Sequence, residues 1–385
     1  MTVTAAQGFL ASGVAAGIKE SGDADLALVV NRGPSRAAAG VFTSNRVQAA
    51  PVRWSRQALS DGRLAAVVLN SGGANACTGP SGAEDARRTA EHTARALGVG
   101  VVPDEIAVCS TGLIGVPLPM DKVTSGIDAA AARLSPERGE EAAVAIKTTD
   151  SVHKTAAASG PGWTVGGMAK GAGMLAPGLA TMLVVLTTDA DLAAPALDAA
   201  LRGAVRTTFD RVDSDGCMST NDTVLLLASG ASGVTPGQAA FEEAVHAVCL
   251  DLARQLIEDA EGASKEIEVQ VVGAASEDDA VTVGRSIARN NLLKCALHGE
   301  DPNWGRVLSA IGTTDAVFDP DRLDVAVNGV RVCRDGAADE PRDKVDLSAR
   351  HVTITADLRS GDASAVIWTN DLTAEYVHEN SAYSS

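Results

Sequence analysis

The chain has few aromatic residues, no long apolar run and fewer basic than acidic residues. Aromatic residues make up 3% of the 385 residues, so the core has to be built from Val, Leu, Ile and Ala. No stretch of about 18 uncharged apolar residues occurs, which predicts that no segment spans a membrane. The segment from Met1 to Phe9 lacks a basic region followed by an apolar one, and we therefore expect a cytoplasmic protein without a secretory signal.

Charge, cysteine and histidine exclude further classes. The net charge of −17 argues against a nucleic-acid partner, because binding to phosphates needs clustered Lys and Arg side chains. Six cysteines are scattered without a Cys-x-x-Cys pair, which predicts reduced and mostly buried thiols. The six histidines form no cluster with each other or with cysteine, so we expect no metal site. The acidic loop Asp210–Asp222 lacks most of the spacing of a calcium loop, and we expect it to hold no cation.

What the sequence does contain is a regular alternation of apolar runs and helical segments. At 385 residues the chain is longer than one core usually supports, so we expect two large lobes of mixed α/β structure, layered as a sandwich of mixed sheets and helices. The expected strands are Leu26–Val30, Leu64–Leu69, Ile106–Cys109, Trp163–Lys170, Met182–Leu186, Thr223–Ala228, Glu266–Val272, Leu323–Val327, His351–Ala356 and Ala365–Trp368. The expected helical segments are Glu84–Leu97, Ser125–Ile146, Leu192–Thr207, Gly237–Asp259 and Asn291–His298.

Two segments need a separate description. The polar stretch Ser151–Gly160 is expected to be a loop. The segment Glu266–Val272 alternates polar and apolar residues with a period of two, which predicts an antiparallel strand with one face in water.

A junction between a glycine-rich loop and an apolar strand lies near the middle of the chain. Gly166–Gly173 is rich in glycine, and the apolar run Met182–Leu186 starts directly after Thr181. A threonine at this point can simply open the strand. If the bond between Ala180 and Thr181 were cut, Thr181 would instead carry a hydroxyl nucleophile and an α-amine that could act as its base. The pattern alone leaves both interpretations open.

Three further loops have a structural and a chemical interpretation. At the exit of an expected strand, the hydroxyl of Thr111 and the N–H of Gly112 could stabilise an oxyanion, or the turn could merely need a glycine. The loop Asn70–Gly79 is either a tight connection or a wall of a ligand site. Gly171–Ala176 matches G-x-G-x-x-A, but Pro177 follows where a helix should continue, so we reject a dinucleotide-binding site.

Eight short motifs occur in a fixed order along the chain: Asn70–Gly79, Ser110–Gly115, Lys147–Asp150, Lys170–Met174, Leu179–Met182, Asp259–Lys265, His298–Arg306 and the tail Tyr376–Ser385. In this order they resemble the ornithine acetyltransferase (glutamate N-acetyltransferase) family of arginine biosynthesis, from about Gly8 to the C-terminus. One departure is the loop Asp259-Ala-Glu-Gly, where the family more often has Asp-Gly-Glu-Gly; Glu261 itself is retained.

The resemblance implies a precursor that cleaves itself between Ala180 and Thr181. Residues 1–180 would form the α chain and residues 181–385 the β chain. Two copies of each chain would assemble as an α2β2 heterotetramer. The implied fold is the self-cleaving threonine-nucleophile fold of the D-aminopeptidase and ornithine acetyltransferase type. The implied reaction moves an acetyl group from N-acetylornithine to glutamate through an acetyl-threonine intermediate. Some family members also accept acetyl-CoA as the donor, and no other cofactor is implied.

The resemblance also assigns site residues by motif. Thr181 would be the nucleophile, and Thr111 and Gly112 would form the oxyanion hole. Substrate contacts would fall on Thr181 and on Thr148, Lys170, Glu261, Asn380 and Ser385. Because a threonine follows Thr148, the motif leaves open which of Thr148 and Thr149 contacts the substrate.

Two other functions remain open at this point. A self-processing amidohydrolase or aminopeptidase would use the same nucleophile but pass the acyl group to water. A non-enzymatic binding protein on the same scaffold would not need Thr181 at all.

Overall fold

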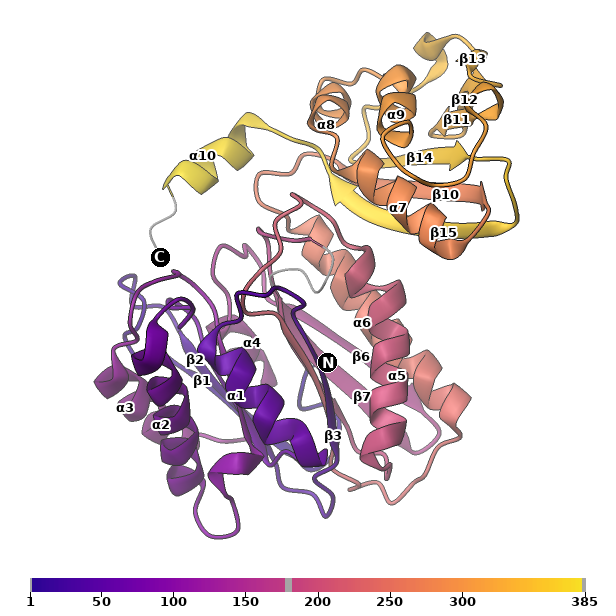
Figure 1. Ribbon diagram of the computed structural model, residues 1–385. Helices are drawn as coiled ribbons and strands as arrows, with labels where there is room; N and C mark the ends of the chain where they lie inside the picture. Colours follow the sequence, from indigo (N-terminus) through magenta and orange to yellow (C-terminus); the bar gives the residue numbers. More distant parts are fainter. Residues whose placement is uncertain (1, 177–181, 383–385) are drawn as a thin grey trace.

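The computed structural model describes residues 2–176 and 182–382, and in these ranges the chain forms two lobes (Figure 1). Residues before about 260 build the larger lobe, and residues 266–370 build the smaller one. The last helix, α10 (Ala374–Ala382), leaves the smaller lobe and lies above the larger one. No helix in the described ranges is both long and apolar enough to cross a bilayer.

Two mixed sheets form the larger lobe. One has the strand order β1-β2-β4-β5, with only β4 and β5 parallel, and its strands are Phe9–Val14, Leu26–Asn31, Ala66–Asn70 and Ile106–Ser110. The other has the order β3-β9-β8-β7-β6, with only β9 and β8 parallel, and its strands are Ala38–Phe42, Thr223–Ala228, Leu183–Thr188, Trp163–Lys170 and Lys154–Gly160.

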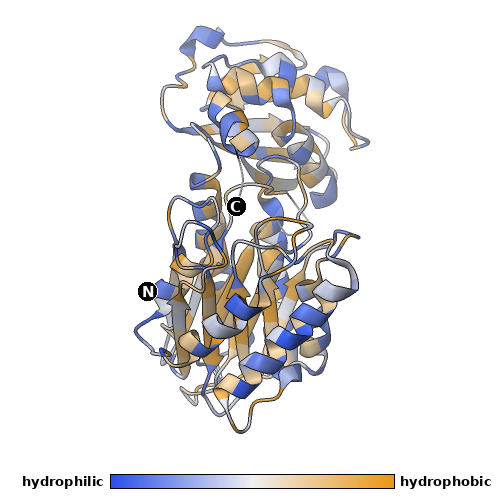
Figure 2. Ribbon diagram, turned by 90° about the vertical axis from the view of Figure 1, so that its left-hand side faces the viewer, coloured by the Kyte–Doolittle hydropathy of each residue, from blue (hydrophilic) through white to orange (hydrophobic). Residues whose placement is uncertain are grey.

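The two sheets pack face to face between two layers of helices. Val67 of β4 shares one buried cluster with Val185 of β8 and Leu225 of β9, so these faces meet at the centre. The other face of the first sheet packs under α2 (Gly79–Leu97) and α3 (Met120–Ala131). Because both faces of the central strands are buried, β2, β4 and β9 consist almost entirely of apolar residues, as the orange strands of this lobe in Figure 2 show.

The remaining helices of this lobe complete the layers. Helices α5 and α6 cover the outer face of the five-stranded sheet, while α1 packs against β5 and α4 against β1; their bounds are Ala194–Thr207, Gln238–Glu258, Ala50–Ala58 and Gly139–Ala145.

The smaller lobe has its own sheet and core. Its strand order is β13-β12-β11-β14-β10-β15, with the strands Ala337–Ala338, Val330–Arg334, Asp324–Val327, His351–Asp357, Glu266–Ala274 and Ala363–Asn370. One face packs against helices α7, α8 and α9, which span Glu277–Ala288, Asn291–His298 and Trp304–Ile311. Short 3₁₀ turns connect elements of both lobes at Leu59–Asp61, Pro103–Glu105, Phe209–Arg211, Pro320–Arg322 and Arg342–Lys344.

The architecture confirms the expected mixed α/β layers, and three expected elements match residue for residue: Trp163–Lys170, Thr223–Ala228 and Asn291–His298. The loop expected over Ser151–Gly160 is wrong, because Lys154–Gly160 is strand β6 and forms an antiparallel hairpin with β7. Its alanines carry little strand signal, and the pairing is imposed by the neighbouring strand.

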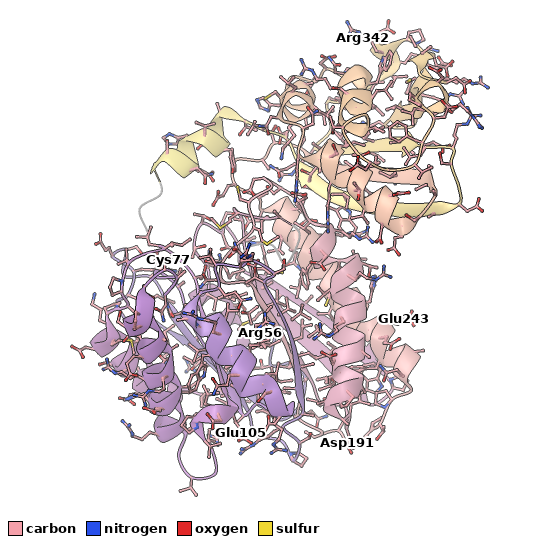
Figure 3. The ribbon with its side chains drawn as sticks, in the orientation of Figure 1. Arg56, Cys77, Glu105, Asp191, Glu243 and Arg342 are labelled. Atoms are coloured by element: carbon pink, nitrogen blue, oxygen red, sulfur yellow. The ribbon has the colours of Figure 1, made fainter. Side chains whose placement is uncertain are left out.

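Three other expectations need correction. The segment Ser125–Ile146 is not one helix, since α3 ends at Ala131 and α4 begins at Gly139. Strand β10 does have one polar face, but it pairs parallel to β14 as well as antiparallel to β15. The cysteines are free, but three of them are exposed rather than buried; one is Cys77, labelled in Figure 3 near the end of the larger lobe that α10 overhangs.

The two lobes do not coincide with the division at residue 180 that the resemblance implies. Strands β8 and β9 follow residue 181, yet they lie in one sheet with β3, β6 and β7, which precede it. Two chains produced by cleavage at that bond would therefore share ladders and a core. The division into chains 1–180 and 181–385 stays a prediction.

Replacing Phe241 by alanine tests the packing of α6 on the sheet. Phe241 is fully buried, and its ring centroid lies 5.8 Å from that of Trp163 on β7. We expect the free energy of unfolding in urea to fall by about 3–5 kcal/mol, because the lost ring leaves a cavity. Val377→Ala on α10, where the valine is 62% exposed, is the control and should change it by less than about 0.5 kcal/mol. Equal losses in the two variants would contradict this packing.

Candidate active site

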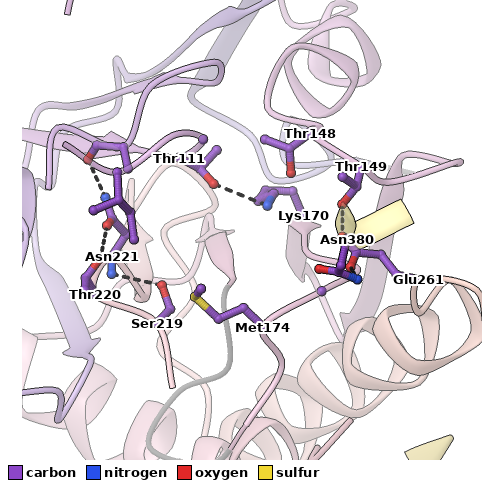
Figure 4. Close-up of a pocket in the computed structure, with 14 residues that line it drawn as sticks. Thr111, Thr148, Thr149, Lys170, Met174, Ser219, Thr220, Asn221, Glu261 and Asn380 are labelled. Carbon is purple, nitrogen blue, oxygen red and sulfur yellow. Dashed lines mark hydrogen bonds between the residues drawn. The ribbon is translucent and has the colours of Figure 1, made fainter. Parts of the chain in front are cut away.

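A cavity of about 150 Å³ opens where several loops of the larger lobe meet α10 (Figure 4). Its walls come from the ends of β5 and β7, the loop before β9, the loop after α6 and the helix α10. All six of the described residues that the motifs assign to a site line this one cavity: Thr111, Gly112, Thr148, Lys170, Glu261 and Asn380. The structure thus brings together motifs that are widely separated in the sequence.

Lys170 is a buried cation in the wall of this cavity. It is the last residue of β7, it is 2% exposed, and its Nζ donates a hydrogen bond to Thr111 Oγ1 over 3.3 Å. Burial lowers the pKa of Lys170, although the negative charge of Asp150 acts in the opposite direction. An ammonium group placed in this way attracts an anion such as a carboxylate.

The Thr111–Gly112 pair is locked against the loop that follows β4. The N–H of Thr111 donates to the carbonyl of Asn70 over 3.0 Å. Gly112 has a φ of +127°, and a Cβ at this position would lie 2.5 Å from the backbone nitrogen of Gly73. Only glycine fits at such an approach, so the glycine expected from the sequence is required by backbone contact.

The loop Asn70–Gly79 acts mainly as a connection. The side-chain amide of Asn70 donates to the carbonyl of Gly73, and that of Asn75 donates to the carbonyl of Gly82. These bonds hold the loop to itself and to α2, and only Ala74 of this loop lines the cavity. Of the two interpretations, the structure favours the tight connection.

Glu261 forms the wall opposite the Thr111–Gly112 pair. Its Oε1 accepts from the Thr149 hydroxyl over 2.6 Å, and its Oε2 accepts from the Asn380 amide over 2.9 Å. A Cβ on Gly173 would lie 2.2 Å from Oε2, so this glycine lets the carboxylate pack against the backbone. The Thr149 hydroxyl is thus engaged by Glu261, while Thr148 lies beside Lys170 in Figure 4.

Three residues that the motifs assign to the site, Ala180, Thr181 and Ser385, lie outside the described ranges. The described chain resumes at Met182, which is buried and donates its N–H to Asp222 Oδ1 over 3.1 Å. The next residue, Leu183, pairs with Lys170 in the β7–β8 ladder. The residue that follows Thr181 is therefore fixed close to the strand end that carries Lys170.

Sequence reasoning missed two polar residues directly before β9. The Asn221 amide donates to the carbonyls of Ala74 and Ser110, over 2.6 and 2.8 Å, and so joins two loops of the cavity. Asp222 is fully buried, and burial raises its pKa well above the ordinary value. Its Oδ2 finds no hydrogen-bond partner among the residues that the structure describes. The available signal was an Asn-Asp pair directly before a fully apolar strand.

The comparison with known proteins agrees with the ordered motifs. The model of the ArgJ family matches residues 10–385. The chain belongs to the ArgJ family. It is 72% identical to the arginine biosynthesis bifunctional protein ArgJ of Streptomyces coelicolor and 63% identical to that of Thermobifida fusca, in each case over 100% of both chains. As a member of this family the chain is an enzyme, and the resemblance inferred from the motifs is confirmed.

A solved structure of a relative is also similar. It is the ornithine acetyltransferase of Mycobacterium tuberculosis in complex with ornithine, 57% identical to this chain. The match covers 47% of this chain and 96% of that chain, with a TM-score of 0.45.

Gly112→Ala tests the close contact between the Thr111–Gly112 pair and the backbone of Gly73. The added methyl group would collide with the backbone of Gly73, so we expect the free energy of unfolding in urea to fall by about 1–3 kcal/mol more than in a matched control. The control is Gly115→Ala, since Gly115 also has a positive φ of +83° but open space around its Cβ. Equal losses would show that backbone strain alone is responsible and that the contact is absent.

Proposed function

We propose that this ArgJ-family enzyme transfers the acetyl group of N-acetylornithine to glutamate and releases ornithine and N-acetylglutamate. The observation that carries the proposal is the cavity itself, in which a buried cation, Lys170, and a carboxylate, Glu261, line one space of about 150 Å³. An amino acid carries both an α-carboxylate and an ammonium group, so these two side chains complement it. Full-length relatives named arginine biosynthesis bifunctional protein support this substrate class.

In the proposed mechanism Thr181 is the nucleophile and its own α-amine is the base. A free α-amine has a pKa of about 7.7–8.0, so it can accept the hydroxyl proton near neutral pH, unlike a lysine with a pKa of about 10.4. The Thr181 oxygen attacks the acetyl carbonyl, and Thr111 and the Gly112 N–H hold the oxyanion. An oxyanion donor of this kind commonly contributes about 3–4 kcal/mol.

The second half-reaction uses the same cavity. Ornithine leaves with the proton, glutamate enters, and its amine attacks the acetyl-Thr181 ester, which completes a ping-pong cycle. Lys170 would bind the α-carboxylate of either amino acid, and Glu261 would attract an ammonium group. Thr148, Asn380 and Ser385 would supply the remaining substrate contacts, with Thr148 preferred over Thr149 because Glu261 engages the Thr149 hydroxyl.

Self-cleavage would produce the free amine. The Thr181 hydroxyl attacks the carbonyl of Ala180 in an N→O acyl shift, which breaks the peptide C–N bond and frees the α-amine. Hydrolysis of the resulting ester then frees the Thr181 hydroxyl and separates the two chains. The ladders on both sides of β8 support this step, since they would hold the new N-terminus beside Lys170 after the bond breaks. We further propose that the two chains assemble as an α2β2 heterotetramer in the cytoplasm, and that acetyl-CoA serves as a second donor.

The first test is the covalent state of the purified protein. We expect two chains by mass spectrometry, and N-terminal sequencing of the second should begin Thr-Met-Leu-Val. Thr181→Ala removes the nucleophile, so this variant should remain one chain and lose acetyl transfer. An intact chain with full activity would contradict the proposed nucleophile.

The second test separates transfer from hydrolysis, the alternative that shares the nucleophile. With N-acetylornithine alone we expect a burst of about one ornithine per active site and then slow release, because the acetyl group stays on Thr181. Adding glutamate should restore steady turnover and form N-acetylglutamate. Equal ornithine release with and without glutamate would favour the hydrolase. A parallel assay with acetyl-CoA and glutamate measures the second donor.

A further inference from the structure

Four charged residues cluster at the back of the substrate cavity, and we call them the buried charge network: Asp150, Lys154 and Lys170, which are buried, and Asp259, whose side chain is 8% exposed. Lys154 is fully buried, and its Nζ donates to Asp150 Oδ1 over 2.8 Å and also to Asp259 Oδ2. Only Lys170 of the four lines the cavity. No substrate contact is assigned to the other three. Their role therefore depends on the segments with which they form hydrogen bonds.

Asp150 fixes two backbone segments of the cavity wall. Its Oδ2 accepts from the N–H of Thr148 over 3.0 Å, and its Oδ1 accepts from the N–H of Gly171 over 2.6 Å. The first bond holds the threonine loop, and the second holds the residue directly after Lys170. Both oxygens of one carboxylate are thus used to set the positions of neighbouring substrate-contact residues.

The same carboxylate is the main favourable charge near Lys170. Burial makes the pKa of Lys170 fall, and the groups whose charges act on it come from four segments: Asp150 before β6, Lys154 on β6, Glu261 after α6 and Asp222 before β9. Of these, Asp150 raises the pKa most, while Lys154 lowers it. In turn, burial would raise the pKa of Asp150, but the charges of Lys170 and Lys154 lower it to about 2, so the carboxylate is ionised at neutral pH.

We propose that Asp150 is a positioning residue for substrate recognition, which orders the cavity wall and keeps positive charge on Lys170. A neutral lysine does not attract a carboxylate, so the charge state of Lys170 sets the upper pH limit of substrate binding. The inference rests on the proposed function, since it takes the α-carboxylate of the amino-acid substrate as the ligand of Lys170.

The experiment measures kcat/KM for N-acetylornithine between about pH 6.5 and 10 in the wild-type protein and in Asp150→Asn. Binding needs the ammonium form of Lys170, so kcat/KM falls as the pH rises through its pKa. Loss of the Asp150 charge lowers that pKa further, and the fall should begin about one pH unit or more earlier. Above both pKa values this shift corresponds to about a tenfold loss relative to wild type.

Lys154→Gln provides a test with the opposite sign. It removes a positive charge that lowers the pKa of Lys170, so the fall in kcat/KM should begin at higher pH than in wild type. If these residues had a purely structural role, the pH at which kcat/KM falls would not shift in opposite directions in the two variants. If Asp150→Asn fails to fold, this upward shift still decides the outcome, and its absence overturns the proposal.

Asp259→Asn is the matched control. It removes the other carboxylate of the buried charge network, which accepts hydrogen bonds from Lys154 and Ser151 but is not among the charges that act most strongly on Lys170. The pH at which kcat/KM falls should stay within about 0.3 units of wild type, whatever happens to stability. A downward shift as large as that of Asp150→Asn would overturn the specific role of Asp150.

Ornithine binding by calorimetry over the same pH range separates this proposal from the proposed function. Binding does not need turnover, so the variants can be compared even if wild type fails to transfer acetyl groups. Absence of transfer with intact pH shifts would reject the proposed reaction alone. Transfer in wild type with identical pH dependence in all variants would reject the role of Asp150 alone.

Discussion

The position of strand β8 between β7 and β9 is the constraint on which the candidate site depends. Leu183 pairs with Lys170 on one side and with Thr223 on the other, and all six residues of the strand are buried. This ladder fixes the first described residue after the expected cleavage bond, Met182, whose N–H is held by Asp222. The loops of the cavity are attached to the ends of these strands, so the sheet sets the positions of the loops.

The buried charge network illustrates a second constraint on the same region. Buried ions lose their hydration, and a buried ion pair is weak evidence for stability. Here two ammonium groups and two carboxylates alternate, and Asp150 and Asp259 also accept backbone N–H bonds. The arrangement specifies the geometry of the cavity wall and the charge that faces it. It also explains how Lys170 can carry a positive charge although it is almost completely buried, because the charge of Asp150 raises its pKa.

Much of the larger lobe could be predicted because its central strands are buried on both faces. Leu26–Asn31 and Thr223–Ala228 are therefore apolar except for one terminal polar residue each. Where a strand lacks this signal the prediction failed, as for Lys154–Gly160, whose alanines become a strand only through pairing with β7. The parallel pairing of β10 with β14 was equally hidden, because periodicity describes the faces of a strand and not its neighbours.

For the site, the sequence by itself determined the residue types and the family, because motifs and their order can be identified without knowing where the residues lie in space. It could not reveal that the Thr149 hydroxyl is engaged by Glu261, that Asp150 supports Lys170, or that Asp222 holds Met182. These relations join residues from separate segments, and only folding brings them within hydrogen-bond distance. Burial then changes their chemistry, because the pKa of a lysine or an aspartate depends on its desolvation and its neighbours. Tertiary structure therefore decided which of the motif residues lie together in one cavity and how burial shifts their pKa values.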